Sequence, residues 1–217
     1  MNLRLHTYYR SSAAYRVRIA LNLKGLAYDA VPVHLVRSGG EQRLPGFLGI
    51  NPHGLIPVLE DDGQVIQQSL AIMEYLDEVH PTTSLLPGTA LDRAMIRQFS
   101  LALACDVHPV NNLRVVKYLG EHLGASDEDK RTWMLHWMQV GLAALETDLQ
   151  QRERRGDFCW GDAPTMADCC LIPQLYNARR WGLDLAPFPH LTAIETACQA
   201  LPAFKAAHPD QQADCPD

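Results

Sequence analysis

The sequence has no apolar run approaching the roughly 20 residues that a helix needs to span a bilayer. It has no block of basic residues either, because the 19 lysines and arginines are scattered and the formal net charge is -6 at pH 7. We therefore expect neither nucleic acid nor membrane as a partner, while a local basic pocket for a small anion is compatible with this charge. The chain begins directly with a strand pattern and shows no cleavable apolar segment, so no targeting peptide is expected.

The six cysteines form no CxxC pair, and no cluster of His, Cys, Asp and Glu has the spacing of metal ligands. Cys169 and Cys170 are neighbours within a helix pattern. These features favour thiols kept in a reducing compartment over a disulfide framework or a zinc site. The sequence therefore predicts a cytoplasmic protein without a bound metal.

The length of 217 residues suits one large domain or two small ones, and no repeat or low-complexity tract divides the chain. Strand and helix patterns mix over residues 1–80, in the order β-α-β, an irregular loop, then β-β-α. A linker rich in Pro, Thr and Ser follows at 81–89, and helix patterns dominate beyond it. We predict an α/β domain over 1–80 and an all-helical domain over 90–217, with a ligand cleft between them. The polar tail after His208 is expected to be mobile.

Individual elements follow from local patterns. Alternating apolar residues predict strands, and apolar residues three and four apart predict helices. Thr165 and Asp168 have the spacing of a capping box and are expected to be structural. The predicted strands begin at Leu3 and cover 28–34, 55–59 and 64–67. The predicted helices follow Ser11 and cover 70–79, 91–123 and 133–149, and two more run from a start within 163–168 to about Trp181 and from about Leu191.

The most informative stretch is the turn between the first strand and the first helix. There the aromatic and basic residues Tyr8, Tyr9 and Arg10 lead into Ser11 and Ser12. A serine in this position is typical of a helix N-cap. The same geometry also presents a hydroxyl and unpaired amides to an anion such as a thiolate. From these residues alone, both interpretations stay open.

Five segments, in order along the chain, carry a family resemblance. They read SSAAYRVRIAL from Ser11, NPHGLIPVL from Asn51, QQSLAIMEYL from Gln67, CDVHPVNNLRVVKYL from Cys105 and PTMADCCLIPQLYNARRW from Pro164. With them the chain resembles cytosolic glutathione transferases over nearly its whole length, and within these the zeta class of maleylacetoacetate and maleylpyruvate isomerases. The resemblance implies a thioredoxin-like N-terminal domain followed by a helical domain, glutathione as the cofactor, and a homodimer.

The first motif departs from the class pattern SSCxWRVRIAL at two positions. Ala13 replaces its cysteine and Tyr15 replaces its tryptophan. The missing cysteine weakens the case for a thiol-transferase side activity and leaves Ser11 as the main hydroxyl candidate. By resemblance, Ser11 activates the glutathione thiolate, and Ser12 and Ala13 belong to the surrounding turn.

The resemblance also implies contacts along the glutathione backbone. A cis bond before Pro57 would present the backbone of Ile56 to the cysteinyl part, whereas the alternative is an ordinary proline at a strand edge. Ser69, with Gln68 beside it, would hold the γ-glutamyl carboxylate at a helix N-terminus, and plain capping is the alternative. His53 would lie near the glycyl end, or belong to a solvated turn.

Three polar residues surround a proline in the second predicted domain. His108, Asn112 and Arg114 lie near Pro109, which is expected to kink a helix. Polar residues at such a kink suggest contacts with glutathione or substrate. The alternative is that they bond the carbonyls freed by the kink.

Two arginines are expected to bind the substrate. The substrates of the class are dianions, and planar guanidinium groups suit carboxylates, which favours Arg10 and Arg180. Arg179 is expected to be solvated. Arg16 and Arg18 are expected to be structural, because helix geometry points them away from the turn.

The implied reaction is the cis-trans isomerisation of maleylacetoacetate to fumarylacetoacetate, a step in the breakdown of tyrosine and related aromatic acids. A thiolate adds to the conjugated alkene, the resulting single bond rotates, and glutathione leaves unchanged. Three alternatives stay open. They are a maleylpyruvate isomerase of gentisate breakdown, a conjugating or dehalogenating transferase for small halogenated acids, and a non-catalytic interaction module.

Overall fold

The computed structural model describes residues 3–152 and 156–216, which fall into two compact units. Unit 1 comprises Met1–Leu85 and Gln199–Asp217, and unit 2 comprises Leu86–Cys198. The division differs from the predicted domain boundaries at the end of the chain, because the last residues of the predicted helical domain join the first unit. No helix in the described ranges combines the length and the apolar character needed to cross a bilayer.

Within the described residues, unit 1 contains a four-stranded sheet. Its strands β1 (Leu3–Thr7), β2 (Asp29–Pro32), β3 (Val58–Asp61) and β4 (Gln64–Gln67) lie in the order β2-β1-β3-β4. β1 pairs parallel with β2 and antiparallel with β3, and β3 and β4 form an antiparallel hairpin. The predicted strands are therefore present. β3 starts later than expected, after Pro57, which has no amide to donate to a ladder.

The side-chain alternation of β1 separates the two faces of the sheet. Leu3 and Leu5 pack, together with residues of α1 (Ser12–Leu23) and α3 (Ser69–Val79), in one buried cluster. On the opposite face, the ring of His6 lies 5.7 Å from that of Phe47 in α2 (Pro45–Leu48), measured between centroids. The sheet thus has helices on both sides, as the resemblance predicts.

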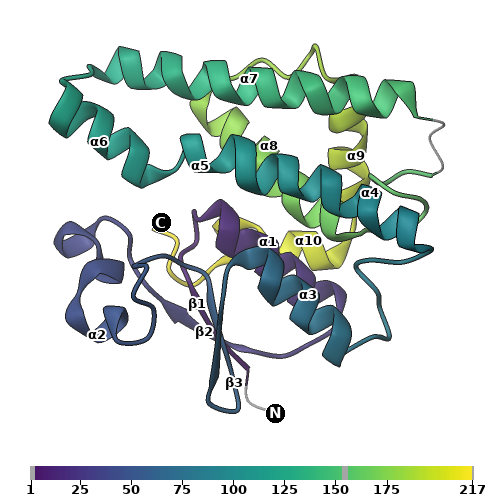
Figure 1. Cartoon of the computed structure of the whole chain (residues 1–217), viewed down its shortest axis with the longest axis horizontal. Helices are drawn as coiled ribbons and strands as arrows, with labels where there is room; N and C mark the ends of the chain where they lie inside the picture. The colour runs from purple at the N-terminus through teal and green to yellow at the C-terminus, as the bar shows by residue number, and fades with distance from the viewer. Residues whose placement is uncertain (1–2, 153–155, 217) are drawn as a thin grey trace. The chain divides into compact units, whose positions relative to one another are not determined.

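The C-terminal segment packs on α1. Helix α10 (Pro202–Ala207) lies beside α1 (Figure 1), and the side-chain amide of Asn22 donates to the carbonyl of Ala203 over 3.0 Å. Beyond α10, the amide of Gln212 donates to the carbonyls of Ala206 and His208. The tail that the sequence suggests is mobile is instead hydrogen-bonded along its course.

Unit 2 is helical. Helix α8 starts at the predicted Thr165–Asp168 capping box and ends before Gly182, whose φ of 78° only glycine adopts easily. The pattern over 91–123 predicts one kinked helix, but the structure breaks it at Asn111, close to Pro109. The elements are α4 (Ala90–Leu101), the π-helix η3 (Ala102–Val107), α5 (His108–Val110), α6 (Leu113–Leu123), α7 (Asp127–Gln151), α8 (Met166–Trp181) and α9 (Pro189–Ala200).

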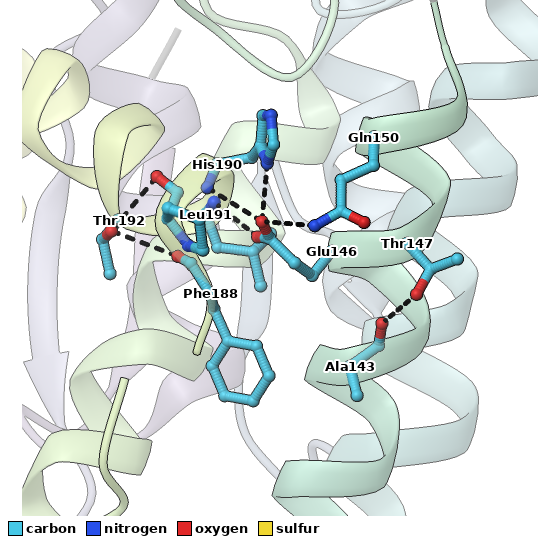
Figure 2. Close-up of polar contacts among 9 residues, drawn as sticks. Ala143, Glu146, Thr147, Gln150, Phe188, His190, Leu191 and Thr192 are labelled. Atoms are coloured by element: carbon cyan, nitrogen blue, oxygen red, sulfur yellow. Dashed lines mark hydrogen bonds and ion pairs between the residues drawn. The ribbon is translucent and has the colours of Figure 1, made fainter. Parts of the chain in front are cut away.

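A buried carboxylate joins α7 to α9. Figure 2 shows Glu146 pointing at the first turn of α9, where its two oxygens accept from the backbone amides of His190 (3.0 Å) and Leu191 (3.1 Å). The same carboxylate contacts Nδ1 of the His190 ring at 2.6 Å. Burial by itself raises the pKa of Glu146, but the hydrogen bonds from His190 and Leu191 outweigh it and the pKa is lowered.

Candidate active site

Ser11 closes the turn between β1 and α1. Its amide donates to the carbonyl of Tyr8 over 3.0 Å, and its Oγ accepts from the amide of Ala14 over 3.2 Å. The capping interpretation is therefore confirmed. An accepting hydroxyl keeps its own proton for donation, so Ser11 can cap the helix and still donate to an anion. The side chains of Ser11, Ser12 and Ala13 are partly exposed, which leaves this end of α1 accessible.

Aromatic rings lie next to this turn. The guanidinium carbon of Arg10 is 6.0 Å from the ring centre of Tyr8 and 5.7 Å from that of Tyr9. Burial raises the pKa of Tyr8 to about 12, although the nearby Arg10 cation works in the opposite direction. The Tyr8 phenol therefore stays neutral near pH 7 and is a poor candidate for a base.

The loop before β3 contains the predicted cis bond. The Ile56–Pro57 peptide is cis, as the resemblance implies. Ile56 packs in one buried cluster with Tyr8 and Ala14, so the loop and the first turn lie together. The side chain of Asn51 holds the loop by bonding the carbonyl of Leu55 and the amide of His53. His53 is exposed, and no hydrogen bond to a described residue fixes the orientation of its imidazole.

The start of α3 carries a contact that we did not predict. Gln68 precedes the helix with a φ of 69° and makes no side-chain capping bond among the described residues. Ser69, the first helical residue, is buried, and its Oγ accepts from Nη1 of Arg16 over 3.1 Å. Arg16, expected to be only structural, thus brings a buried positive charge to this helix N-terminus. Since Ser69 accepts from Arg16, its proton is available for another acceptor.

Three predicted segments of unit 1 therefore converge. The cis-proline loop packs against the turn of Ser11, and Arg16 links α1 to the start of α3. The resulting set offers a hydroxyl at one helix N-terminus and a hydroxyl with a guanidinium at another. Both are sites where an anion is stabilised.

The predicted residues of unit 2 occupy the break between α5 and α6. His108 begins α5, and Asn112 caps α6 by accepting from the amide of Arg114 over 3.1 Å. This bond is local, but its donor is an amide and not one of the carbonyls that the alternative interpretation invoked. The sequence analysis did not single out Asn111. Its side chain is buried, and neither the oxygen nor the nitrogen of its amide is hydrogen-bonded to a described residue. A buried amide of this kind is a candidate ligand contact.

Two neighbouring arginines near the end of α8 have different surroundings. Arg180 is exposed, with Nη2 3.3 Å from Oδ1 of Asn177 and its guanidinium 5.5 Å from the ring centre of Trp181. Arg179 is exposed, as expected, and is also paired with Glu195 at 2.5 Å. Of the two, Arg180 is better placed to bind an external carboxylate.

Two buried cysteines of unit 2, Cys159 and Cys198, are poor nucleophiles. Burial raises the pKa of Cys159 and that of Cys198, and the carboxylate of Asp168 raises both further. Over the described ranges, no three His, Cys, Asp or Glu side chains gather in a way that could hold a metal ion. A hydroxyl-based site is what the arrangement supports.

The chain has close relatives among proteins of known sequence. Residues 5–84 match the family model of the glutathione S-transferase N-terminal domain. The chain is 47% identical over 214 residues to a probable maleylacetoacetate isomerase of Vibrio cholerae, covering 99% of each protein. It is 51% identical over 207 residues to the maleylacetoacetate isomerase of Rhizobium meliloti, covering 95% of this chain and 96% of that protein. It is 41% identical over 213 residues to a maleylpyruvate isomerase of a Ralstonia species, covering 98% and 99%.

Solved structures agree with these relatives. A maleylpyruvate isomerase described as a bacterial zeta-class glutathione S-transferase matches with a TM-score of 0.95 and 40% identity, covering 98% of this chain and 100% of that one. A maleylacetoacetate isomerase from Methylobacterium extorquens, solved with malonate and glutathione, matches with a TM-score of 0.94 and 40% identity, covering 99% and 100%. The predicted fold class is confirmed. The chain belongs to the zeta class of glutathione S-transferases, in the family of the maleylacetoacetate and maleylpyruvate isomerases.

Proposed function

We propose that this protein is a glutathione-dependent isomerase that converts maleylacetoacetate to fumarylacetoacetate. Relatives that match nearly the whole chain are named maleylacetoacetate isomerases, and two solved structures of such relatives contain bound glutathione. The observation that carries the proposal is the Ser11 hydroxyl, which accepts from Ala14 at the N-terminus of α1 and so aims its own proton elsewhere. Glutathione, when bound, supplies a thiolate that adds reversibly to the conjugated double bond and lets it rotate.

The residues at the start of α1 suit a thiolate. Ser11 donates a hydrogen bond to the sulfur, and the first amides of the helix, around Ser12 and Ala13, add positive potential. Together they favour the ionised form of a thiol that is otherwise mostly protonated at neutral pH.

Other residues anchor the rest of the tripeptide. The backbone of Ile56, before Pro57, pairs with the cysteinyl part, and Ser69 with Gln68 binds the γ-glutamyl carboxylate. Buried Arg16 strengthens the second contact by its charge. The further contacts that we propose are made by His53, His108, Asn111, Asn112 and Arg114.

Arg10 and Arg180 are proposed to hold the two substrate carboxylates while the middle of the molecule rotates. Residues 1–80 then supply most glutathione contacts and 90–217 most substrate contacts, with 81–89 as the linker. We also propose that the protein is cytoplasmic and acts as a homodimer. Maleylpyruvate carries the same pair of charged ends and is the second candidate substrate, which the relative from Ralstonia favours.

The test is the ultraviolet disappearance of fresh maleylacetoacetate, measured with and without glutathione. Loss that depends on glutathione, with no net consumption of it, supports the isomerase. Consumption of glutathione, or release of halide from halogenated acids, would instead show a conjugating or dehalogenating enzyme. No activity on either maleyl substrate and no retention on glutathione resin would favour an interaction module and overturn the proposal.

A further inference from the structure

The peptide groups on both sides of Tyr9 are held by distant residues. The carboxylate of Asp214 accepts from the Tyr9 amide over 2.9 Å, across 205 residues of sequence. On the other side, Nη2 of Arg18 donates to the Tyr9 carbonyl over 2.9 Å. Tyr9 lies beyond the end of β1 and two residues before Ser11, so neither bond belongs to the sheet or to α1.

Arg18 also fixes the residue to which Ser11 is bonded. Its Nη1 donates to the carbonyl of Tyr8 (3.2 Å) and to Oγ1 of Thr7 (3.0 Å), and the same Tyr8 carbonyl accepts from the Ser11 amide. The Arg18 side chain is fully buried, which gives its charged hydrogen bonds more weight than they would have in water. The position of Ser11 therefore depends on Arg18.

The same guanidinium connects the turn to the end of the chain. Its Nε donates to the carbonyl of Ala207, the last residue of α10, over 3.1 Å. Beyond α10, Gln212 bonds back to the carbonyls of Ala206 and His208, and the amide of Cys215 donates to the Gln212 carbonyl. These bonds shape the tail so that Asp214 reaches Tyr9.

We propose that Asp214 and Arg18 are positioning residues for the glutathione thiolate, which they serve by clamping Tyr9 so that the Ser11 hydroxyl keeps its place. The inference rests on the proposed role of Ser11. A donor must lie within hydrogen-bond distance of the sulfur, and small displacements of such a group cost much of the rate. The C-terminal segment is then a part of the machinery that ionises glutathione, through the contact of Asp214 with the Tyr9 amide.

The test uses the full-length protein. The substitutions are made in the partly exposed tail, so that the buried core stays intact. Asp214→Ala removes the acceptor, Asp214→Asn keeps an oxygen that can accept from the Tyr9 amide, and Asp210→Ala is the matched control. Asp210 lies in the same segment, is exposed, and contacts His208 rather than the turn. The first readout is the ultraviolet absorbance of the glutathione thiolate in the binary complex, titrated against pH. The second is the isomerase rate.

We expect Asp214→Ala to raise the pH midpoint of thiolate formation by about one pH unit and to lower kcat/KM about tenfold, the size of one lost charge-assisted hydrogen bond. Asp214→Asn should recover most of both effects, and Asp210→Ala should match wild type. If Asp214→Ala has the wild-type pH midpoint of thiolate formation, the inference is overturned. This holds even if the melting temperature of the variant falls, because Asp214 would then contribute to stability alone. If wild type itself binds glutathione only as the thiol, the proposed function fails instead, and the two failures are distinguishable without substrate.

Discussion

Arg16 donates a hydrogen bond from Nη1 to Oγ of Ser69 over 3.1 Å, and both side chains are buried. The contact joins two helices of unit 1 whose N-termini are the candidate sites for the thiolate and the γ-glutamyl carboxylate of bound glutathione. The serine accepts from a cation and therefore presents its proton to the next acceptor. An anion at this point meets an oriented donor with a positive charge behind it.

Loss of this pair should weaken glutathione binding more than catalysis. We expect Ser69→Ala to raise the Kd for glutathione about tenfold, as expected for one lost hydrogen bond to a carboxylate, while kcat at saturating glutathione changes little. Calorimetric titration measures the Kd. Ser38→Ala, at an exposed position in the short 3₁₀ helix η1 (Arg37–Gly39) of the same unit, is the control. A wild-type Kd for Ser69→Ala would remove Ser69 from the site.

Ser11→Ala should lower kcat/KM about 100-fold, because a donor to a developing or stored negative charge is lost. The substitution also removes the N-cap of α1, which costs about 1 kcal/mol of stability. Ser11→Thr keeps both the cap and the hydroxyl and is expected to retain most of the activity. Initial rates of maleylacetoacetate loss compare the three proteins. If the alanine variant were as active as the threonine variant and wild type, Ser11 would be excluded as the donor.

The bond between Glu146 and the start of α9 should make stability depend on pH. The folded state lowers the pKa of this carboxyl below its ordinary 4.5, so its contribution is fully present above that value and is lost as the pH falls through the folded-state pKa. Glu146→Gln should reduce the free energy of unfolding at pH 7 by about 2 kcal/mol. The difference from wild type should shrink as the pH falls through the folded-state pKa, because protonation leaves both side chains uncharged.

Chemical unfolding of Glu146→Gln at a series of pH values measures this difference. The control is Glu121→Gln, an exposed glutamate on α6, for which we expect no comparable loss. A difference between Glu146→Gln and wild type that is constant from neutral to acidic pH would contradict the assignment.

Gly141 on α7 faces the π-helix η3 closely. A Cβ at this position would lie 2.1 Å from Cγ2 of Val107. Although alanine favours a helix over glycine, we expect Gly141→Ala to destabilise the protein by about 1–3 kcal/mol, because valine is stiff and the core cannot yield. The double variant with Val107→Ala should recover part of this loss in thermal unfolding. Gly120→Ala is the control, since only the flexible end of Lys130 lies close there. If Gly141→Ala is as stable as wild type, the packing described here is wrong.

Elements with strong local signals are predictable from the sequence. The hairpin strand β4 and helix α8 fall where turn residues, a capping box and a stop glycine predict them. The cis bond at Pro57 and the site turn at Ser11 follow from the family resemblance and not from composition, since prolines and capping serines are common in other settings.

What the sequence could not predict depends on residues far apart along the chain. Arg16 and Ser69 are 53 positions apart, and Asp214 and Tyr9 are 205 apart. Helix periodicity predicts that the Arg16 side chain points away from the turn of Ser11. It does not predict which other helix that side chain contacts. The break at Asn111 is missed for a related reason, because the apolar pattern continues through it while the backbone does not.

The return of the chain's end to the first unit has a consequence for biosynthesis. Residues of unit 2 are made between the two parts of unit 1, so the ribosome must finish all of unit 2 before Asp214 exists. The turn at Ser11 is therefore synthesised before unit 2, whereas the carboxylate that bonds Tyr9 is synthesised after it. A nascent chain that has not yet reached Asp214 carries Ser11 without the carboxylate that bonds the Tyr9 amide.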